Sequence, residues 1–240
     1  MDLKKSLGKA VQFYWSTRLR QGESQGGSAG AKDRGNRSAV TGGAQADGFI
    51  QLIRDILVEC GLPEVSIEAK ATTLPGYFRA TKDWDLIVVS EGMLIASIEF
   101  KAQAGPSFGN NFNNRVEEAI GSATDLWTAF REGAFSISER PWLGYFMMLE
   151  ERSESLRPVK LLSPHFPVFE EFNETSYARR YEIFCERLIR ERLYDSACFI
   201  MSSKEDGLRG KYTEPNLDLC FRNFAESLMG KAIAFAHTRK

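Results

Sequence analysis

Two short apolar runs, separated by four residues, constrain the fold of this chain more than any other feature. The runs are Trp84–Val89 and Leu94–Lys101, and both are rich in isoleucine and valine. Runs of this length and composition are typical of buried β-strands. The connection, Ser90–Met93, is short and contains a glycine. We therefore predict that the two runs pair as an antiparallel hairpin.

Charged residues stand at the ends of this hairpin that come together. Asp85 begins the first predicted strand, and Glu99 lies where the second one ends. Side chains alternate between faces along a strand, so Lys101 points the same way as Glu99. Buried charges are costly unless they pair or hold a metal. Carboxylates are hard ligands suited to Mg²⁺, and a neighbouring lysine can steady an attacking water, so the group favours phosphodiester cleavage.

The Glu-x-Lys spacing carries little weight alone, because the chain repeats it at Glu68-Ala69-Lys70. Asp55 precedes that second copy at a similar distance, but its neighbours have the apolar spacing of a helix, so no hairpin joins the two. A cross-strand ion pair on a solvated sheet face also explains the charges at 85, 99 and 101. Both interpretations remain open on spacing alone.

Composition indicates an ordinary globular protein. The 240 residues suffice for one large or two small domains, and 43% are hydrophobic and 26% charged. No apolar run approaches a membrane span, and the first residues lead into no signal-peptide core, so we expect a cytoplasmic protein. Four scattered cysteines in apolar contexts indicate core thiols in a reducing compartment: Cys60, Cys185, Cys198 and Cys220.

The first 40 residues are basic, with eight Lys or Arg against three Asp or Glu, although the whole chain has a net charge of −1. Residues 2–20 have the spacing of an amphipathic helix, and residues 21–43 form a Gly-rich connection. A local basic surface is sufficient for phosphate contacts. We expect this arm to order on DNA, with a plain mobile loop as the alternative. The candidate contacts are Lys32, Arg34, Asn36 and Arg37.

An Asn-rich stretch, Ser107–Arg115, follows the second strand of the hairpin. Asparagine offers a donor and an acceptor that suit adenine edges, and arginine suits guanine. Such stretches are also simply good turns. We predict a DNA-contacting loop whose candidates, with Gln103 at the end of the preceding strand, are Asn110, Asn111, Asn113, Asn114 and Arg115.

The remaining pattern alternates helices and strands, which predicts an α/β fold with a mixed sheet flanked by helices. We expect a helical and Gly-rich N-terminal arm over residues 1–43 and a single nuclease domain over residues 44–240. Expected helices cover residues 44–60, 116–131, 176–194 and 217–235. Expected strands cover residues 65–70, 142–149 and 197–201, with a turn at 73–79 and an irregular segment at 150–174.

Other chemistries find little support. The only histidines, His165 and His237, are too few for histidine-based nucleases or zinc hydrolases. Gly26-Gly27-Ser28-Ala29-Gly30 matches the hydrolase nucleophile motif, but a helix precedes it where a strand is required. No phosphate-binding Gly-x-x-x-x-Gly-Lys loop and no dinucleotide fingerprint occurs, so we expect no ATP or NAD cofactor.

Several segments together resemble the XhoI family of restriction endonucleases. The likeness spans most of the chain, and its Asn-rich block is specific. It is carried by Leu74–Arg79, Trp84-Asp85, Glu99–Lys101, Gly105–Arg115, Glu117–Gly121, Gly42-Gly43 with Asp47–Phe49, and Ser163–Phe169.

The resemblance implies a type II restriction enzyme with a PD-(D/E)xK nuclease core. Such an enzyme would depend on Mg²⁺ and cut double-stranded DNA at a palindrome as a homodimer, leaving 5′ phosphates. For this family the site would be CTCGAG.

The resemblance also assigns roles to single residues. It places metal ligation on Asp85, Glu99 and the Phe100 main-chain carbonyl, and it places Lys101 beside the attacking water or the scissile phosphate. A second metal would draw on Glu68 or Glu59. Trp84 stands where that core has proline, which makes Asp83 a rival to Asp85. We prefer Asp85 because it adjoins the apolar strand.

Two alternatives remain. The same fold can carry a catalytically inert DNA-binding module whose charges are structural. It can also carry a repair or recombination nuclease with little sequence preference.

Overall fold

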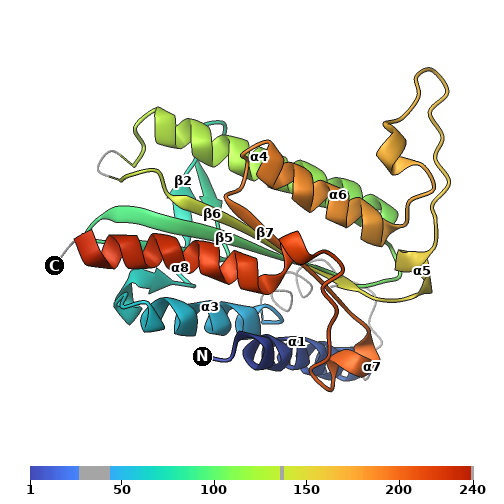
Figure 1. Cartoon of the computed structure of the whole chain (residues 1–240), viewed down its shortest axis with the longest axis horizontal. Coiled ribbons are helices and arrows are strands. Elements are labelled where there is room, and N and C mark those ends of the chain that lie inside the picture. The colour runs from blue at the N-terminus through green and yellow to red at the C-terminus, as the bar shows by residue number, and fades with distance from the viewer. Residues whose placement is uncertain (27–43, 136–137, 239–240) are drawn as a thin grey trace.

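A five-stranded mixed sheet forms the centre of the protein (Figure 1). The computed structural model describes residues 1–26, 44–135 and 138–238. The strand order is β1-β4-β5-β6-β7, antiparallel from β1 to β5 and parallel from β5 to β7. The strands are β1 (Ile67–Glu68), β4 (Leu86–Ser90), β5 (Met93–Gln103), β6 (Trp142–Glu150) and β7 (Ser196–Ser202).

Helices cover both faces of this sheet, so a hydrophobic core lies on each side (Figure 1). Helices α1 (Leu3–Gly26), α3 (Asp47–Glu59) and α8 (Phe221–Thr238) pack on one face. Helices α4 (Gly109–Arg131) and α6 (Tyr177–Arg190) pack on the other. The predicted α/β class with a mixed, helix-flanked sheet is confirmed.

The predicted hairpin is present as β4 and β5. Ser90 pairs with Met93 across a two-residue turn. Glu91 and Gly92 there have φ of 53° and 75°. Both values lie in the left-handed region, and two such residues in a row make a tight turn that matches the right-handed twist of the flanking strands. Strand β5 starts at Met93 and, as expected from the sequence, runs to Gln103. Glu99 therefore lies inside β5 and not at its end.

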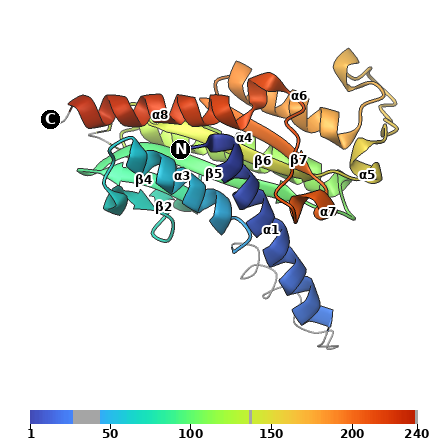
Figure 2. The same ribbon diagram turned by 60° about the horizontal axis from the view of Figure 1, so that its bottom comes forward.

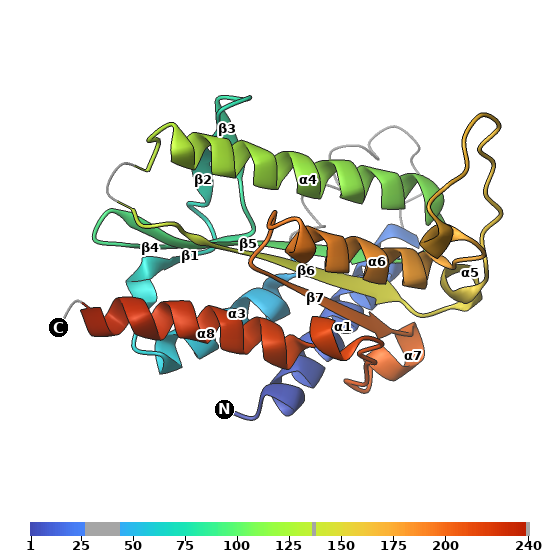
Figure 3. The same ribbon diagram turned by 45° about the horizontal axis from the view of Figure 1, so that its top comes forward.

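A second, two-stranded sheet precedes the hairpin, where we predicted only a turn. Its strands are β2 (Thr73–Pro75) and β3 (Thr81–Asp83), which pair antiparallel. Figure 3 shows this ribbon beside α4, on the face of the large sheet that α4 covers. Leu74 is buried in that core, and this anchor fixes the ribbon over the middle of β5.

The N-terminal helix is longer than predicted, because α1 continues to Gly26 through residues assigned to the Gly-rich connection. Its buried side chains, Leu7, Val11 and Trp15, belong to the same core cluster as α3. Figure 2 shows α1 crossing α3, with its later turns extending away from the sheet. The division at residues 43 and 44 stays a prediction, and the rest of the connection, 27–43, lies outside the described residues.

Other element boundaries differ from those predicted from the sequence. The predicted strand at 65–70 is a 3-10 turn, Glu64–Ser66, followed by the two residues of β1. The irregular segment contains two short helices, α5 (Ser153–Leu156) and η2 (Glu170–Phe172). Before α8 lie α7 (Lys204–Gly207) and η3 (Leu217–Leu219). Among the described residues, no helix is long and apolar enough to span a membrane.

Candidate active site

The site lies where β5 extends beyond the first residue of its neighbouring strand β4. Strand β4 starts at Leu86, which pairs with Ile98, so β5 beyond that point has no strand on this edge. The side chain of Asp85 fills part of the gap, because its Oδ2 accepts a hydrogen bond from the Phe100 N–H at 2.8 Å. The register that brings Leu86 to Ile98 also brings Asp85 opposite Glu99.

Glu99 and Lys101 project from β5 on the same face, as strand alternation requires. Lys101 Nζ lies 2.7 Å from Glu99 Oε1 and 3.9 Å from Asp85 Oδ2. Glu99 is buried, with only 2% of its surface exposed. Its second oxygen, Oε2, is buried and has no hydrogen-bond partner among the described residues. An unsatisfied buried carboxylate oxygen is costly, and the cost persists only where a ligand or a function offsets it.

A second lysine completes the cluster. Lys82, on β3, places its Nζ 3.5 Å from Glu99 Oε1 and 4.3 Å from the centre of the buried Trp84 ring. Burial lowers the pKa of Lys82, although the Glu99 carboxylate opposes that shift. Two ammonium groups thus face the buried Glu99 carboxylate, and with Asp85 beside Lys101 the cluster holds two cations and two carboxylates.

Asp85 is more open to solvent than Glu99, with 36% of its side chain exposed against 3%. Burial of the remainder raises the pKa of Asp85, while Lys101 and the Phe100 N–H act in the opposite direction. The site therefore holds Asp85 ionised at some cost, which a cation at the carboxylate would offset.

Of this cluster, Lys82, Glu99 and Lys101 line a cleft of about 690 Å³ between the β2–β3 ribbon, β5 and α4, whereas Asp85 is not part of its lining. Glu99 and Lys101 lie within it. Basic and acidic side chains share its lining: Arg79, Lys82, Lys101 and Arg115 against Glu99, Glu117, Glu118 and Asp125.

The donor set fits a hard divalent cation. No group of three or more His, Cys, Asp or Glu side chains that could hold a metal occurs in the described part of the chain. Mg²⁺ does not require one, because it is bound through one or two carboxylates plus substrate phosphates and water. The orphaned Glu99 Oε2 and the half-buried Asp85 provide such a pair, next to the Phe100 peptide.

The rival carboxylate and the second-metal candidates lie elsewhere. Asp83 is exposed and accepts a hydrogen bond from the Thr73 hydroxyl at 2.5 Å, so Asp85 and not Asp83 reaches Glu99. Glu59 binds the N-terminal ammonium at 3.2 Å. Glu68 lies on β1, beside a different hollow. Neither Glu59 nor Glu68 lines the cleft.

The Asn-rich stretch is helical and not a loop, because α4 begins at Gly109. Phe108 is buried and Phe112 packs on α6 with its ring centre 5.0 Å from that of Tyr181, and this anchoring overrides the local turn preference. Arg115 is brought to the cleft. The exposed or half-exposed asparagines occupy the first turns of α4, and they are Asn110, Asn111, Asn113 and Asn114.

Gln103 is brought to the interior, with 4% of its surface exposed. Its amide nitrogen donates to the carbonyls of Ser107 and Phe108, and its oxygen accepts from the Tyr181 hydroxyl. It links β5, α4 and α6, and contact with DNA would require these bonds to break. The arm candidates Lys32, Arg34, Asn36 and Arg37 lie outside the described residues.

Two charged residues of the cleft, Lys82 and Asp125, were not predicted as site residues from the sequence. Lys82 precedes Asp85 by three positions and reaches Glu99 only because the β2–β3 ribbon folds back over β5. Asp125 lies on α4, far along the chain, and accepts hydrogen bonds from the 76–79 loop. Its one sequence signal is an acidic residue among the apolar positions of a helix, which is weak on its own.

Comparison with known proteins supplies the family. The model of restriction endonuclease XhoI matches residues 25–214, a span that includes every side chain of the cleft. The chain belongs to the XhoI family of restriction endonucleases. Members of this family are type II site-specific deoxyribonucleases, which bind DNA and hydrolyse its phosphodiester bonds.

Individual members of the XhoI family are closely similar to the chain. It is 52% identical to the type II restriction enzyme BstVI of Geobacillus stearothermophilus over 84% of this chain and 92% of the relative. It is 48% identical to the type II restriction enzyme XhoI of Xanthomonas vasicola over 65% of this chain and 64% of the relative. It is 47% identical to the type II restriction enzyme AbrI of Azospirillum brasilense over 69% of this chain and 74% of the relative. No solved structure matches the chain.

Proposed function

We propose that this XhoI-family protein is a Mg²⁺-dependent endonuclease that cuts both strands of CTCGAG as a homodimer in the cytoplasm. The observation that carries the chemistry is the cluster in which Lys101 lies near both Asp85 and Glu99, at a cleft that Glu99 and Lys101 line. The site CTCGAG rests on the family resemblance and on the relative named XhoI.

The carboxylates of Asp85 and Glu99, with the Phe100 carbonyl, would hold the cation. Mg²⁺ bound there would polarise a phosphate oxygen and lower the pKa of water. Asp85 is suited to this role because its Oδ2 is fixed by the Phe100 N–H. Glu99 is suited because its second oxygen is buried and has no hydrogen-bond partner in the described part of the chain.

Lys101 would act beside the carboxylates. Its ammonium, 2.7 Å from Glu99 Oε1, is placed to hold the attacking water or to offset the negative charge that develops on the phosphate. Attack in line expels the 3′ oxygen and leaves a 5′ phosphate. Lys82 adds a second positive charge at the same carboxylate, in a position to neutralise the phosphate of the cut strand.

A palindromic site mirrors a two-fold symmetric protein, so two copies of the chain would each cut one strand. The candidate base contacts are Arg115 in the cleft, the asparagines of α4 and the basic residues of the 27–43 segment. Hydrogen bonds to base edges or deformation of the DNA can both discriminate sequence.

Incubation of the protein with plasmid DNA and Mg²⁺, with an EDTA control, tests the proposal. We expect discrete fragments whose ends map to CTCGAG and carry 5′ phosphates. Fragments ending at another palindrome would overturn the site but not the enzyme class. Smears or random nicks would indicate a nuclease of low specificity, and a gel shift without cutting would indicate an inert DNA-binding module.

A further inference from the structure

Two exposed aromatic side chains stand at the rim of the cleft, on the loop that joins β2 to β3. Tyr77 is 53% exposed and Phe78 is 70% exposed. Their rings pack edge to face, with centres 5.0 Å apart. Phe78 lines the same cleft as Glu99 and Lys101. Large aromatic rings on a protein surface mark an interaction site more often than isolated aliphatic residues do.

A single buried carboxylate holds this loop in place. Asp125, with 3% of its surface exposed, accepts hydrogen bonds from the N–H groups of Tyr77 at 2.7 Å and Phe78 at 2.8 Å. Its other oxygen accepts from Arg79 Nε at 2.7 Å. Burial alone would raise the pKa of Asp125, but the Phe78, Arg79 and Tyr77 donors outweigh it and lower that pKa. The carboxylate is therefore ionised at neutral pH and grips the loop from α4.

A backbone hydrogen bond across the base of the loop also closes it. Gly76 donates from its N–H to the Ala80 carbonyl at 3.2 Å. A Cβ at Gly76 would lie 2.6 Å from both the Arg79 carbonyl oxygen and Asp125 Oδ2, so glycine is required for the close approach. The ribbon beneath is tied to the core by the buried Leu74 and Trp84. The two rings are thus presented on an ordered support.

The occupant that fits this rim is the DNA whose backbone enters the cleft. The loop continues directly into a cleft whose lining includes the cations Lys82, Lys101 and Arg115, which suit phosphate oxygens, beside the acidic Glu99, Glu117, Glu118 and Asp125. Aromatic rings beside such cations stack on bases or pack on deoxyribose, a combination that recurs wherever proteins hold nucleic acid strands.

We propose that the loop Gly76–Arg79 is a DNA-contacting element. In this proposal Tyr77 and Phe78 pack against the nucleotides next to the cut phosphate, and Asp125 is a positioning residue that acts through the loop. The inference rests on the proposed endonuclease function, and it assigns the surface that holds the cut strand in the cleft.

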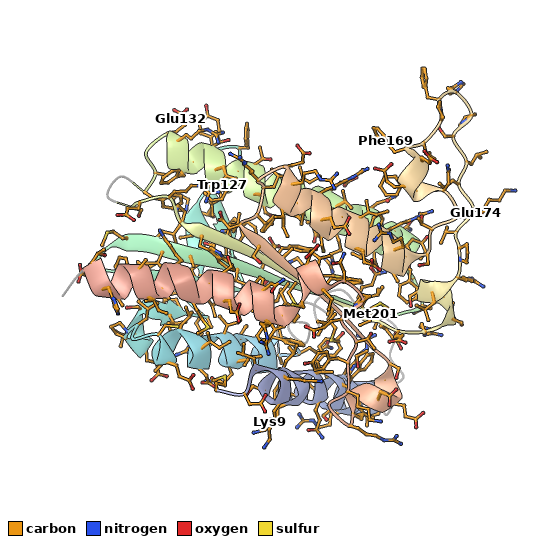
Figure 4. The ribbon with its side chains drawn as sticks, viewed as in Figure 1. Lys9, Trp127, Glu132, Phe169, Glu174 and Met201 are labelled. Carbon is orange, nitrogen blue, oxygen red and sulfur yellow. The ribbon has the colours of Figure 1, made fainter. Side chains whose placement is uncertain are left out.

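The test compares Phe78→Ala with Phe169→Ala. Phe169 is 71% exposed and projects from the segment before η2, far from Trp127 on the cleft helix α4 (Figure 4), and it does not line the cleft. Binding is measured by fluorescence anisotropy, with Ca²⁺, on a duplex carrying the sequence that the wild type cuts. Loss of one stacked ring should raise Kd and KM about tenfold, with kcat changed less, while Phe169→Ala matches the wild type.

The contradicting results are equally specific. A Phe78→Ala protein with Kd and KM within twofold of the wild type would overturn the inference, as would an equal loss in Phe169→Ala. A change in the sedimentation mass of Phe78→Ala without DNA would assign the rings to a protein interface instead. A wild-type protein that cuts nothing refutes the proposed function, whereas these comparisons refute only the loop.

A double-mutant cycle tests Asp125. Because Asp125 acts through the loop, Phe78→Ala should weaken binding far less in an Asp125→Ala background than in the wild type. Far-ultraviolet circular dichroism and thermal unfolding establish that each variant is folded. Additive effects on Kd in folded proteins would show that Asp125 does not position the rings, and would remove its assigned role.

Discussion

At the scale of single residues, the site is a set of charges that the fold stabilises poorly by itself. Glu99 is buried with one oxygen unpartnered, and burial raises the pKa of Asp85. Such costs are typical of sites that await a ligand. Alternation along a strand and the hairpin register allowed the sequence to predict that residues 85, 99 and 101 meet. Lys82 was missed because its approach depends on a ribbon that no local pattern revealed.

The raised pKa of Asp85 leads to a stability prediction. A carboxyl whose pKa is higher in the folded than in the unfolded protein destabilises the folded state above that pKa and ceases to do so as the pH falls through it. Asp85→Asn removes the charge but keeps an oxygen for the Phe100 N–H. The metal-free variant should therefore have a higher Tm than the wild type at pH 7, and the difference should shrink toward acidic pH. Equal Tm values across the range would argue that Asp85 carries no burial cost.

At the scale of elements, local periodicity predicted the helix that has a regular apolar stripe. It missed the elements whose position depends on tertiary packing. The helix expected over residues 44–60 is present as α3, and its regular apolar stripe is buried: Phe49, Leu52, Ile53, Ile56 and Leu57. The Asn-rich stretch was expected to be a loop, yet Phe108 and Phe112 pack on α6 and start α4 early. Residues 73–79, which form β2 and the loop of the β2–β3 ribbon, were predicted as a turn, and the pairing of Leu74 with Lys82 involves residues too far apart for a local pattern to detect.

The ribbon offers its own prediction through Gly76. Gly76→Ala introduces a Cβ that collides with the Arg79 carbonyl and Asp125, so the free energy of unfolding should fall by about 1–3 kcal/mol. Gly230→Ala, in α8, is the matched control, because a Cβ there has nothing within 4 Å, and it should be neutral or stabilising by up to ~1 kcal/mol. Denaturant unfolding of both variants measures the difference. An unaffected Gly76→Ala protein would mean that the loop is not tightly closed.

At the scale of the whole molecule, α/β layering follows from the order of strands and helices, and the prediction of fold class was correct. The described part of the chain brings one such charge cluster together, so the proposed cutting of both strands would take two copies on one palindrome. Periodicity does not predict the interface between two such copies, since an exposed apolar side chain has many explanations.

The proposed homodimer leads to a prediction about mass. Sedimentation of the 27.0 kDa chain with a short duplex containing one recognition site should yield a complex with two protein chains per duplex. A variant of that duplex with the site scrambled serves as the control and should not recruit the pair. One chain per specific duplex at saturation would contradict the two-fold arrangement.

The central claim is that Glu99 and Lys101 perform the chemistry and do not merely pair on a sheet. The most direct measurement is the cleavage rate of Glu99→Gln and Lys101→Ala on plasmid DNA with Mg²⁺, alongside gel shifts with Ca²⁺. We expect cleavage to fall by about a hundredfold or more, while the affinity for DNA changes little. Cleavage at the wild-type rate by both variants would contradict the central claim.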